Sequence, residues 1–353
     1  MAPSVGGGDC EGSGASGAPT LQIHPSRHCN LKCLHCYSES GPQSRETLPT
    51  ETVLETIADA GDLGYRVVSV SGGEPFLYPG LAVLLRYAKS VGLHTTVTTN
   101  GYFLKPRWLE PLHDLIDTLA LSLDGPPDFH NAMRGSPKAF DRLTDGIRTL
   151  GEFQIPFGII HTVTSQNWQH LSWTAEFASS HGAKLLQLHP LELSGRAMAE
   201  LPDDSPEHDV LSRLYLLSFV LASQYAERMA IQCDLLHRQY VLADPELIYS
   251  GELPGDLGQQ CAARLLSLLI LEPDGAIVPV SYGFGRDYQV CNVRQRRLSN
   301  AWPGFIQNGY PKFRRLCRQL FDDVVEHKVS PLFNWYEEIV NRSNRPALVS
   351  LSA

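Results

Sequence analysis

The sequence has no long apolar run and no surplus of positive charge. No stretch approaches the roughly 18 consecutive apolar residues that cross a membrane, and the N-terminus has neither a basic start nor the apolar segment of an export signal. Lysine and arginine total 29 against 38 acidic residues, which gives a formal net charge of -9. Such a surface does not attract a nucleic-acid backbone or an anionic membrane, so neither is expected as the main partner.

Cysteine is also scarce for so long a chain. Eight cysteines in 353 residues are too few for a disulfide framework, and the three that lie closest together could not pair evenly. This usage predicts a reducing, cytoplasmic location. The chain is nevertheless 43% hydrophobic, which is enough to bury the core of one large α/β domain and a smaller one.

Six short apolar runs alternate with segments of helical spacing. The runs lie at 21–25, 66–72, 94–101, 118–125, 157–164 and 185–191. Strands separated by helices predict a parallel sheet, either open or closed into a full or partial barrel, with functional groups at the carboxyl ends of the strands. Residues 1–19 are mostly small or proline, so we predict a disordered tail there and a core domain over 20–200.

The pattern changes after residue 200. Residues 201–230 predict a linker loop followed by one long, largely apolar helix. At 265–283, two apolar runs are joined by Pro-Asp-Gly, which is a β-hairpin signal. A small C-terminal α+β domain that contains this hairpin is therefore predicted over 231–353.

The clearest chemical feature is RHCNLKCLHCYSES at 27–40, where three cysteines follow the first predicted strand with C-x3-C-x2-C spacing. A structural zinc site needs four ligands, and His28 or His35 could complete one. A cubane [4Fe–4S] cluster instead takes thiolates from one compact loop, and three of them leave the fourth iron open for catalysis. The spacing favours the cluster and leaves zinc as the alternative. The three candidate ligands are Cys29, Cys33 and Cys36.

This spacing, followed by Tyr37, resembles that of the radical S-adenosylmethionine (SAM) enzymes. The resemblance implies a partial (β/α)6 TIM-like barrel in which the three cysteines hold a [4Fe–4S] cluster and SAM chelates the open iron. It also implies that His35 lies near the adenine of SAM. The segment SGGEP, which follows the second predicted strand, matches the family segment that binds the amino group of SAM. The residues of that match are Gly72, Gly73, Glu74 and Pro75.

A third region, SLDGPPDFHNAMRG at 122–135, closes the fourth predicted strand. Ser122 can bond a ribose or a carboxylate, and Arg134 offers a planar fork that suits a carboxylate. Related peptide-modifying enzymes carry a similar Ser-x-Asp-Gly with His and Arg four apart; an Asp-Gly turn before a surface helix is the alternative. Asn100 and the segment 194–197 are similarly expected to approach the ribose and the adenine. The further members of the match are Asp124, Gly125 and His130.

The C-terminal segment resembles a SPASM or twitch domain, the cluster-binding extension of many peptide-modifying radical SAM enzymes, but only in degenerate form. Cys261 opens it, and the hairpin follows. Val280 stands where the family has a cysteine, Cys291 replaces a glycine, and Cys317 stands alone. The three cysteines are candidate ligands of an auxiliary cluster; buried free thiols are the alternative.

The resemblance implies that reductive cleavage of SAM yields a 5′-deoxyadenosyl radical that takes hydrogen from a substrate. The expected substrate is a ribosomally synthesised peptide, modified by crosslinking, epimerisation or another radical step. The precursor would dock on this chain directly or through a separate recognition protein, and flavodoxin or ferredoxin would supply electrons. Two alternatives stay open: a small molecule or cofactor precursor as the substrate, and a zinc-binding interaction protein without catalysis.

Overall fold

The computed structural model describes residues 17–252, 257 and 260–345. The predicted disordered tail therefore falls almost wholly outside the described residues. No described helix is both long and apolar enough to cross a membrane.

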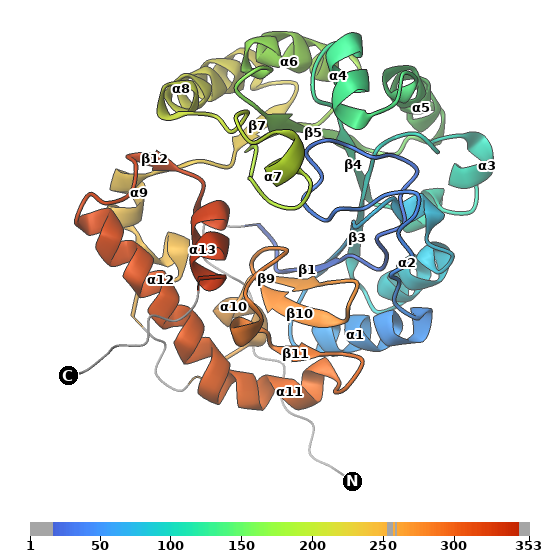
Figure 1. Ribbon diagram of the computed structural model, residues 1–353. Coiled ribbons are helices and arrows are strands. Elements are labelled where there is room, and N and C mark those ends of the chain that lie inside the picture. Colours follow the sequence, from blue (N-terminus) through green and yellow to red (C-terminus); the bar gives the residue numbers. More distant parts are fainter. Residues whose placement is uncertain (1–16, 253–256, 258–259, 346–353) are drawn as a thin grey trace.

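The core of the fold is a curved parallel sheet with helices around its outer side (Figure 1). All six predicted strands form, and each pairs in parallel with the next, which confirms the α/β prediction. They are β1 (Thr20–Ile23), β2 (Val67–Val70), β3 (His94–Thr99), β4 (Thr118–Ser122), β5 (Phe157–Val163) and β6 (Leu185–Pro190). The helices between them are α1 (Thr50–Asp62), α2 (Leu81–Ser90), α3 (Pro106–Leu109), α4 (Pro127–Arg134), α5 (Ala139–Phe153) and α6 (Leu171–Ser180).

The sheet extends beyond these six strands at both ends. Strand β7 (Ala230–Cys233) pairs in parallel with β6. At the other end, the predicted hairpin forms from β9 (Leu268–Leu271) and β10 (Ala276–Pro279), and β9 pairs in parallel with β1. Strand β11 (Cys291–Asn292) completes the order β11-β10-β9-β1-β2-β3-β4-β5-β6-β7. Backbone pairing therefore joins the C-terminal segment directly to the first strand of the barrel.

The part of the chain after β6 contributes mostly helices. The long helix predicted near 210–230 is α8 (His208–Tyr225). The others are α7 (Ala197–Glu200), α9 (Arg238–Ala243), α10 (Ala262–Leu265), α11 (Leu298–Gly304), α12 (Tyr310–Val325) and α13 (Trp335–Ser343). A π-helical turn, Phe305–Gly309, joins α11 to α12, and a two-stranded sheet pairs β8 (Leu236–His237) with β12 (Leu332–Phe333). Short 3-10 helices occupy Pro75–Leu77, His113–Leu115, Trp168–His170, Pro245–Ile248 and Arg286–Tyr288.

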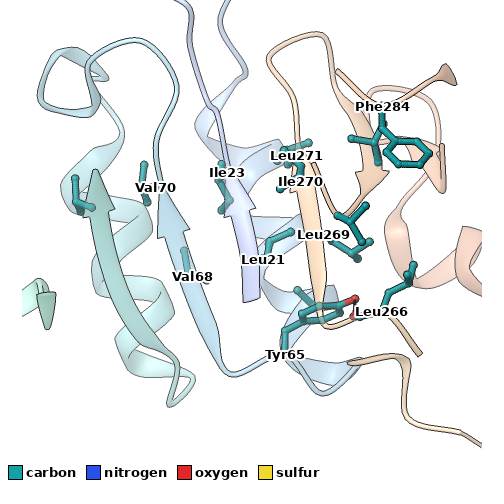
Figure 2. Packing of buried hydrophobic residues seen from close by; sticks show 14 of the residues in the cluster. Leu21, Ile23, Tyr65, Val68, Val70, Leu266, Leu269, Ile270, Leu271 and Phe284 are labelled. Atoms are coloured by element: carbon teal, nitrogen blue, oxygen red, sulfur yellow. Dashed lines mark hydrogen bonds between the residues drawn. The ribbon is translucent and has the colours of Figure 1, made fainter. Parts of the chain in front are cut away.

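The apolar core lies between the sheet and its outer helices. Figure 2 shows Leu21 and Ile23 of β1 between β2 and β9, with side chains from all three strands packed together. Leu21, Ile23 and Leu269 are fully buried, and each such side chain contributes about 1.5–3 kcal/mol through burial. Tyr65 closes the bottom of this core by donating its hydroxyl to the Leu266 carbonyl at 2.8 Å. The first and last thirds of the chain therefore share one core.

Candidate functional site

A cavity of about 570 Å³ lies inside the curve of the sheet. Strand side chains alternate between two sides: apolar residues such as Leu21 and Val68 are buried against the helices, whereas Gln22 and Ser69 line the cavity. This alternation follows from the two-residue period of a strand. It gives the cavity a wall of hydroxyl and amide groups that can hydrogen-bond a polar ligand.

The three cysteines of the loop after β1 all line this cavity. Cys29 and Cys33 are buried and Cys36 is partly buried, and none of the three forms a disulfide. Each sulfur has a polar neighbour. Asn100 Nδ2 lies 3.8 Å from Cys29 Sγ, Arg134 Nη1 lies 3.9 Å from Cys33 Sγ, and Ser38 Oγ lies 3.5 Å from Cys36 Sγ. Hydrogen bonds of this kind to cysteine sulfur tune the potential of iron–sulfur clusters.

The buried setting of this loop favours neutral thiols over thiolates. Burial raises the pKa of the Cys29 thiol to about 12, and the nearby charge of Glu74 raises it further. Burial also raises the pKa of Cys33, although the Arg134 charge opposes that effect. Because a metal centre binds thiolates and not thiols, it would offset this cost by replacing the protons.

The donor set fits an iron–sulfur cluster: three thiols on one loop face one cavity. Within the described ranges, no three His, Cys, Asp or Glu side chains are arranged to hold a single metal ion. A [4Fe–4S] cluster does not require such an arrangement, because each cysteine binds a different iron. A zinc site does require it, since all four ligands contact one ion.

The two glycines of SGGEP pack closely against the backbone that leads into the cysteine loop. Both line the cavity, and Gly72 has a φ of 110°, which only glycine adopts readily. A Cβ on Gly73 would overlap the carbonyl oxygen of His28. Gly73 N and Glu74 N also donate to Ser26 O and His28 O, at 2.8 and 2.9 Å. The loop can therefore pack this closely only against residues without a side chain.

Glu74 and Pro75 do not line the cavity. Pro75 is buried at the start of a 3-10 helix, and Glu74 points into the protein. The Glu74 carboxylate accepts from Thr99 Oγ1 at 2.8 Å and from Asn100 N at 3.0 Å, which ties the end of β2 to the end of β3. Burial raises the pKa of Glu74 to about 7 against these hydrogen bonds. These two residues therefore position the residues around them.

Four further predicted residues line the cavity: His35, Tyr37, Asn100 and Ser122. Asn100 also reaches the loop, donating Nδ2 to Asn30 Oδ1 at 2.9 Å. Burial lowers the pKa of His35 to about 4, so its ring is neutral, and its Nδ1 is buried without a partner within the structure. An unpaired ring nitrogen at a cavity wall suits a ligand that carries a hydrogen-bonding edge.

Arg134 lies at the cavity wall, but its fork is occupied. Its Nε and Nη2 donate to Asp124 at 2.7 and 3.1 Å, and the Asp124 side chain is fully buried. Although burial opposes ionisation, the Arg134 charge holds the pKa of Asp124 well below its usual range. The sequence predicts a bound carboxylate at Arg134, and in the structure that carboxylate belongs to the protein. His130 and His35 lie 3.6 and 3.8 Å from it.

Arg196, within the segment 194–197, has a role that the sequence reasoning missed. Its guanidinium donates to Cys33 O at 2.6 Å and to Ser40 O at 2.7 Å, and its backbone N–H donates to Cys36 O at 3.0 Å. Gly195, with a φ of 54°, packs against the Tyr37 and Cys36 carbonyls, where a Cβ would overlap them. The loop after β6 therefore clamps the cysteine loop through these hydrogen bonds and this close packing.

The C-terminal part of the chain also contributes to the cavity wall. Tyr282 follows Val280, whose φ of 54° is unusual for a β-branched residue. The Tyr282 ring lies 5.2 Å from the Tyr37 ring, and Arg27 donates to the Tyr282 hydroxyl at 3.2 Å. The two tyrosines thus bring the cysteine loop and the C-terminal hairpin into contact.

Next to this wall is a polar group centred on His189 at the end of β6. His189 contacts Asp234 at 2.9 Å and Glu192 at 3.3 Å. Burial opposes protonation of His189, but its bonds with the two carboxylates outweigh that effect and raise its pKa to about 10. Tyr336 of α13 also lines the cavity here. These residues come from distant parts of the sequence and form no recognisable motif, so the sequence did not predict that they lie together.

The three auxiliary-cluster candidates stand on different elements and do not line this cavity. Cys261 precedes α10 and contacts Leu63 O at 3.6 Å, Cys291 is in β11, and Cys317 is fully buried in α12. They are not among the groups able to hold a metal ion in the part of the chain that the structure describes.

Comparison with known proteins identifies the core. Residues 23–178 match the Radical SAM superfamily. An AdoMet-dependent heme synthase of Methanosarcina barkeri is 34% identical over 48% of this chain and 49% of its own length. Fe-coproporphyrin III synthase of the same organism is 28% identical over 80% of this chain and 73% of its own. The sporulation killing factor maturation protein SkfB of Bacillus subtilis is 28% identical over 50% and 43%. The chain thus spans about half the length of some of the curated relatives it matches.

Solved structures agree on the fold. Streptococcus suis SuiB bound to S-adenosylmethionine superposes with a TM-score of 0.65 at 21% identity, over 85% of this chain and 68% of SuiB. SuiB bound to its precursor peptide SuiA gives 0.64 at 20% identity, over 84% and 66%. These structures show the fold, and residues 23–178 match a family whose cofactors are a [4Fe–4S] cluster and SAM.

Proposed function

We propose that this radical SAM enzyme acts on a ribosomally synthesised peptide. When bound, the cluster and SAM supply a 5′-deoxyadenosyl radical that takes hydrogen from the substrate. The observation that carries the proposal is that one cavity is lined both by the three cysteines and by Tyr282, Tyr336 and the His189 group. Reagent and substrate would therefore meet in the same cavity.

The residues of this chain divide the task between them. Cys29, Cys33 and Cys36 would hold the cluster, while the bare backbone at Gly72 and Gly73 would bind the methionine end of SAM. Asn100, Ser122 and His35 would orient its ribose and adenine. The hydrogen bonds of Arg196 and the close packing at Gly73 would keep the cysteine loop fixed. Tyr37 would also contact SAM, because it lines the same cavity.

Two observations support a peptide as the substrate. SkfB is a maturation protein, and SuiB has been solved with a precursor peptide, so chains similar to this one handle peptides. In addition, the cavity is lined by side-chain amides, such as those of Gln187 and Gln232, whose oxygens can accept hydrogen bonds from peptide N–H groups. A separate recognition protein, and flavodoxin or ferredoxin as the electron donor, belong to the same proposal.

Co-expression with a precursor peptide encoded nearby tests the proposal. Mass spectrometry should show a changed peptide mass or stereochemistry with the wild type and none with a C29A/C33A/C36A variant. In parallel, the reconstituted wild type should contain about four irons and release 5′-deoxyadenosine after reduction. SAM cleavage without any change in the peptide would contradict the substrate assignment and leave the chemistry standing. Bound zinc without SAM cleavage would contradict both.

A porphyrin precursor is the second candidate substrate. It is favoured by the relative Fe-coproporphyrin III synthase, whose similarity extends over 80% of this chain and therefore beyond the radical SAM domain. The same reconstituted enzyme, incubated with iron coproporphyrin III in place of the peptide, separates the two. Conversion of the porphyrin, detected by its absorbance and mass, would favour this candidate over the peptide.

A further inference from the structure

Asp124, His130 and Arg134 form a buried polar group next to Cys33 to which the proposed function gives no role. We propose that Asp124 holds the Arg134 guanidinium against Cys33, so that its positive charge raises the reduction potential of the cluster bound there. Arg134 is thus a positioning and tuning residue and not a ligand for substrate. This inference rests on the cluster assignment made above.

The position of Arg134 fixes which groups its guanidinium contacts. It ends α4 and is 8% exposed, and Asp124, just after β4, is fully buried. Nε and Nη2 donate to the two carboxylate oxygens of Asp124 at 2.7 and 3.1 Å. The remaining nitrogen, Nη1, lies 3.9 Å from Cys33 Sγ. A bidentate pair fixes the guanidinium plane, so the third nitrogen is held toward the sulfur.

The surroundings of Asp124 keep it in this orientation. Its backbone N–H donates to His130 Nδ1 at 3.2 Å, and its backbone carbonyl accepts from Asn167 Nδ2 at 3.1 Å. Arg134, His130 and His35 lie 2.7, 3.6 and 3.8 Å from the carboxylate, and the charge of Asp124 also acts on Cys33 and His161. Each carboxylate oxygen of Asp124 accepts from the guanidinium, so a bound SAM carboxylate would have to displace Asp124 to use the same fork.

The sign of the effect on the cluster follows from electrostatics. Reduction adds one electron to the cluster, and a nearby positive charge in a water-poor site stabilises the more negative state. Loss of the Arg134 charge should therefore shift the midpoint potential to more negative values. Neutralising Asp124 while keeping Arg134 should shift it to more positive values, because the guanidinium charge is then uncompensated.

Redox titration of the reconstituted, SAM-free protein, followed by the electron paramagnetic resonance signal of the reduced cluster, tests these signs. R134Q should shift the midpoint potential negative, D124N should shift it positive, and D124N/R134Q should return toward the wild type. R134K keeps the charge without the fork and should fall between R134Q and wild type. Opposite shifts in the two single variants are the signature, since a merely structural pair would not produce them.

A matched control is R314Q. Arg314 is another buried arginine, paired with Glu246 at 3.0 Å on the C-terminal helices, and its loss should lower stability without moving the potential. Unchanged potentials in R134Q and D124N, or shifts of the same sign, would overturn the inference, as would an R134Q protein with normal potential and only weakened SAM binding. If the wild type itself bound no cluster, the proposed function would fail instead, so the two failures are distinguishable. R134K serves if R134Q does not fold.

Discussion

Replacing Arg196 with alanine should loosen the cysteine loop without unfolding the barrel. The guanidinium donates to Cys33 O and Ser40 O at 2.6 and 2.7 Å, and hydrogen bonds to a charged group contribute about 1.5–3 kcal/mol each. Two of them sum to at most about 6 kcal/mol, and the partial exposure of Arg196 reduces this to about 2–4 kcal/mol. That corresponds to about 30- to 700-fold more frequent opening of the loop.

Two assays measure this opening directly. Amide hydrogen exchange should accelerate at 29–40 in R196A while the exchange of β1 to β6 stays unchanged. The rate at which a chelator removes iron from the reconstituted protein should rise in parallel. The control is R294A: Arg294 also donates to two backbone carbonyls, Thr47 O and Pro273 O, at 3.1 and 3.0 Å, but away from the cysteines. An R196A protein that exchanges and releases iron like the wild type would refute the clamp.

Three further predictions concern other parts of the molecule. Gly73→Ala should abolish iron loading, measured by iron content, because its Cβ would overlap His28 O; normal iron content would show that the loop adapts. C261A/C291A/C317A should keep the wild-type iron count and lose about 1 kcal/mol of stability per buried thiol; a drop of iron would instead reveal an auxiliary cluster. The pKa of His189, raised to about 10 in the folded state from an unfolded value near 6.5, should contribute stability that is complete below pH 6.5 and lost as the pH rises toward 10. Urea unfolding across this range should show the slope in the wild type and not in H189Q.

The sequence predicted the barrel well because its signals are local. Each strand, such as β2 with its alternation of valine and serine, carries the two-residue period within the strand itself, and the helices between carry theirs. Pairing of β9 with β1 could not be foreseen. Both are four-residue strands far apart in the sequence, and only the tertiary contact at residues such as Leu21 and Leu269 brings them together.

The candidate site divides in the same way. Motif spacing placed the cysteines, Gly72 and Asn100 around one cavity, because a motif near the end of a strand is positioned by that strand. It did not predict that Glu74 faces inward, because side-chain direction at the end of a strand depends on the partners available there. The role of Arg196 was not predicted for a related reason. It binds backbone carbonyl groups, and these carry no sequence signal because every residue has one.

The motif at 122–135 predicted that Arg134 binds a carboxylate, but it did not predict which carboxylate. An arginine fork predicts a carboxylate partner. Two carboxylates could fill that role: that of SAM, or that of Asp124, ten residues away in the chain. Burial decides between them, because an uncompensated Asp124 carboxylate inside the protein would cost several kcal/mol. The protein's own ion pair is present before any ligand binds. Under the proposed function, SAM would then be bound by the backbone around Gly72 and Gly73 and by Ser122, while Arg134 Nη1 stays near Cys33 Sγ.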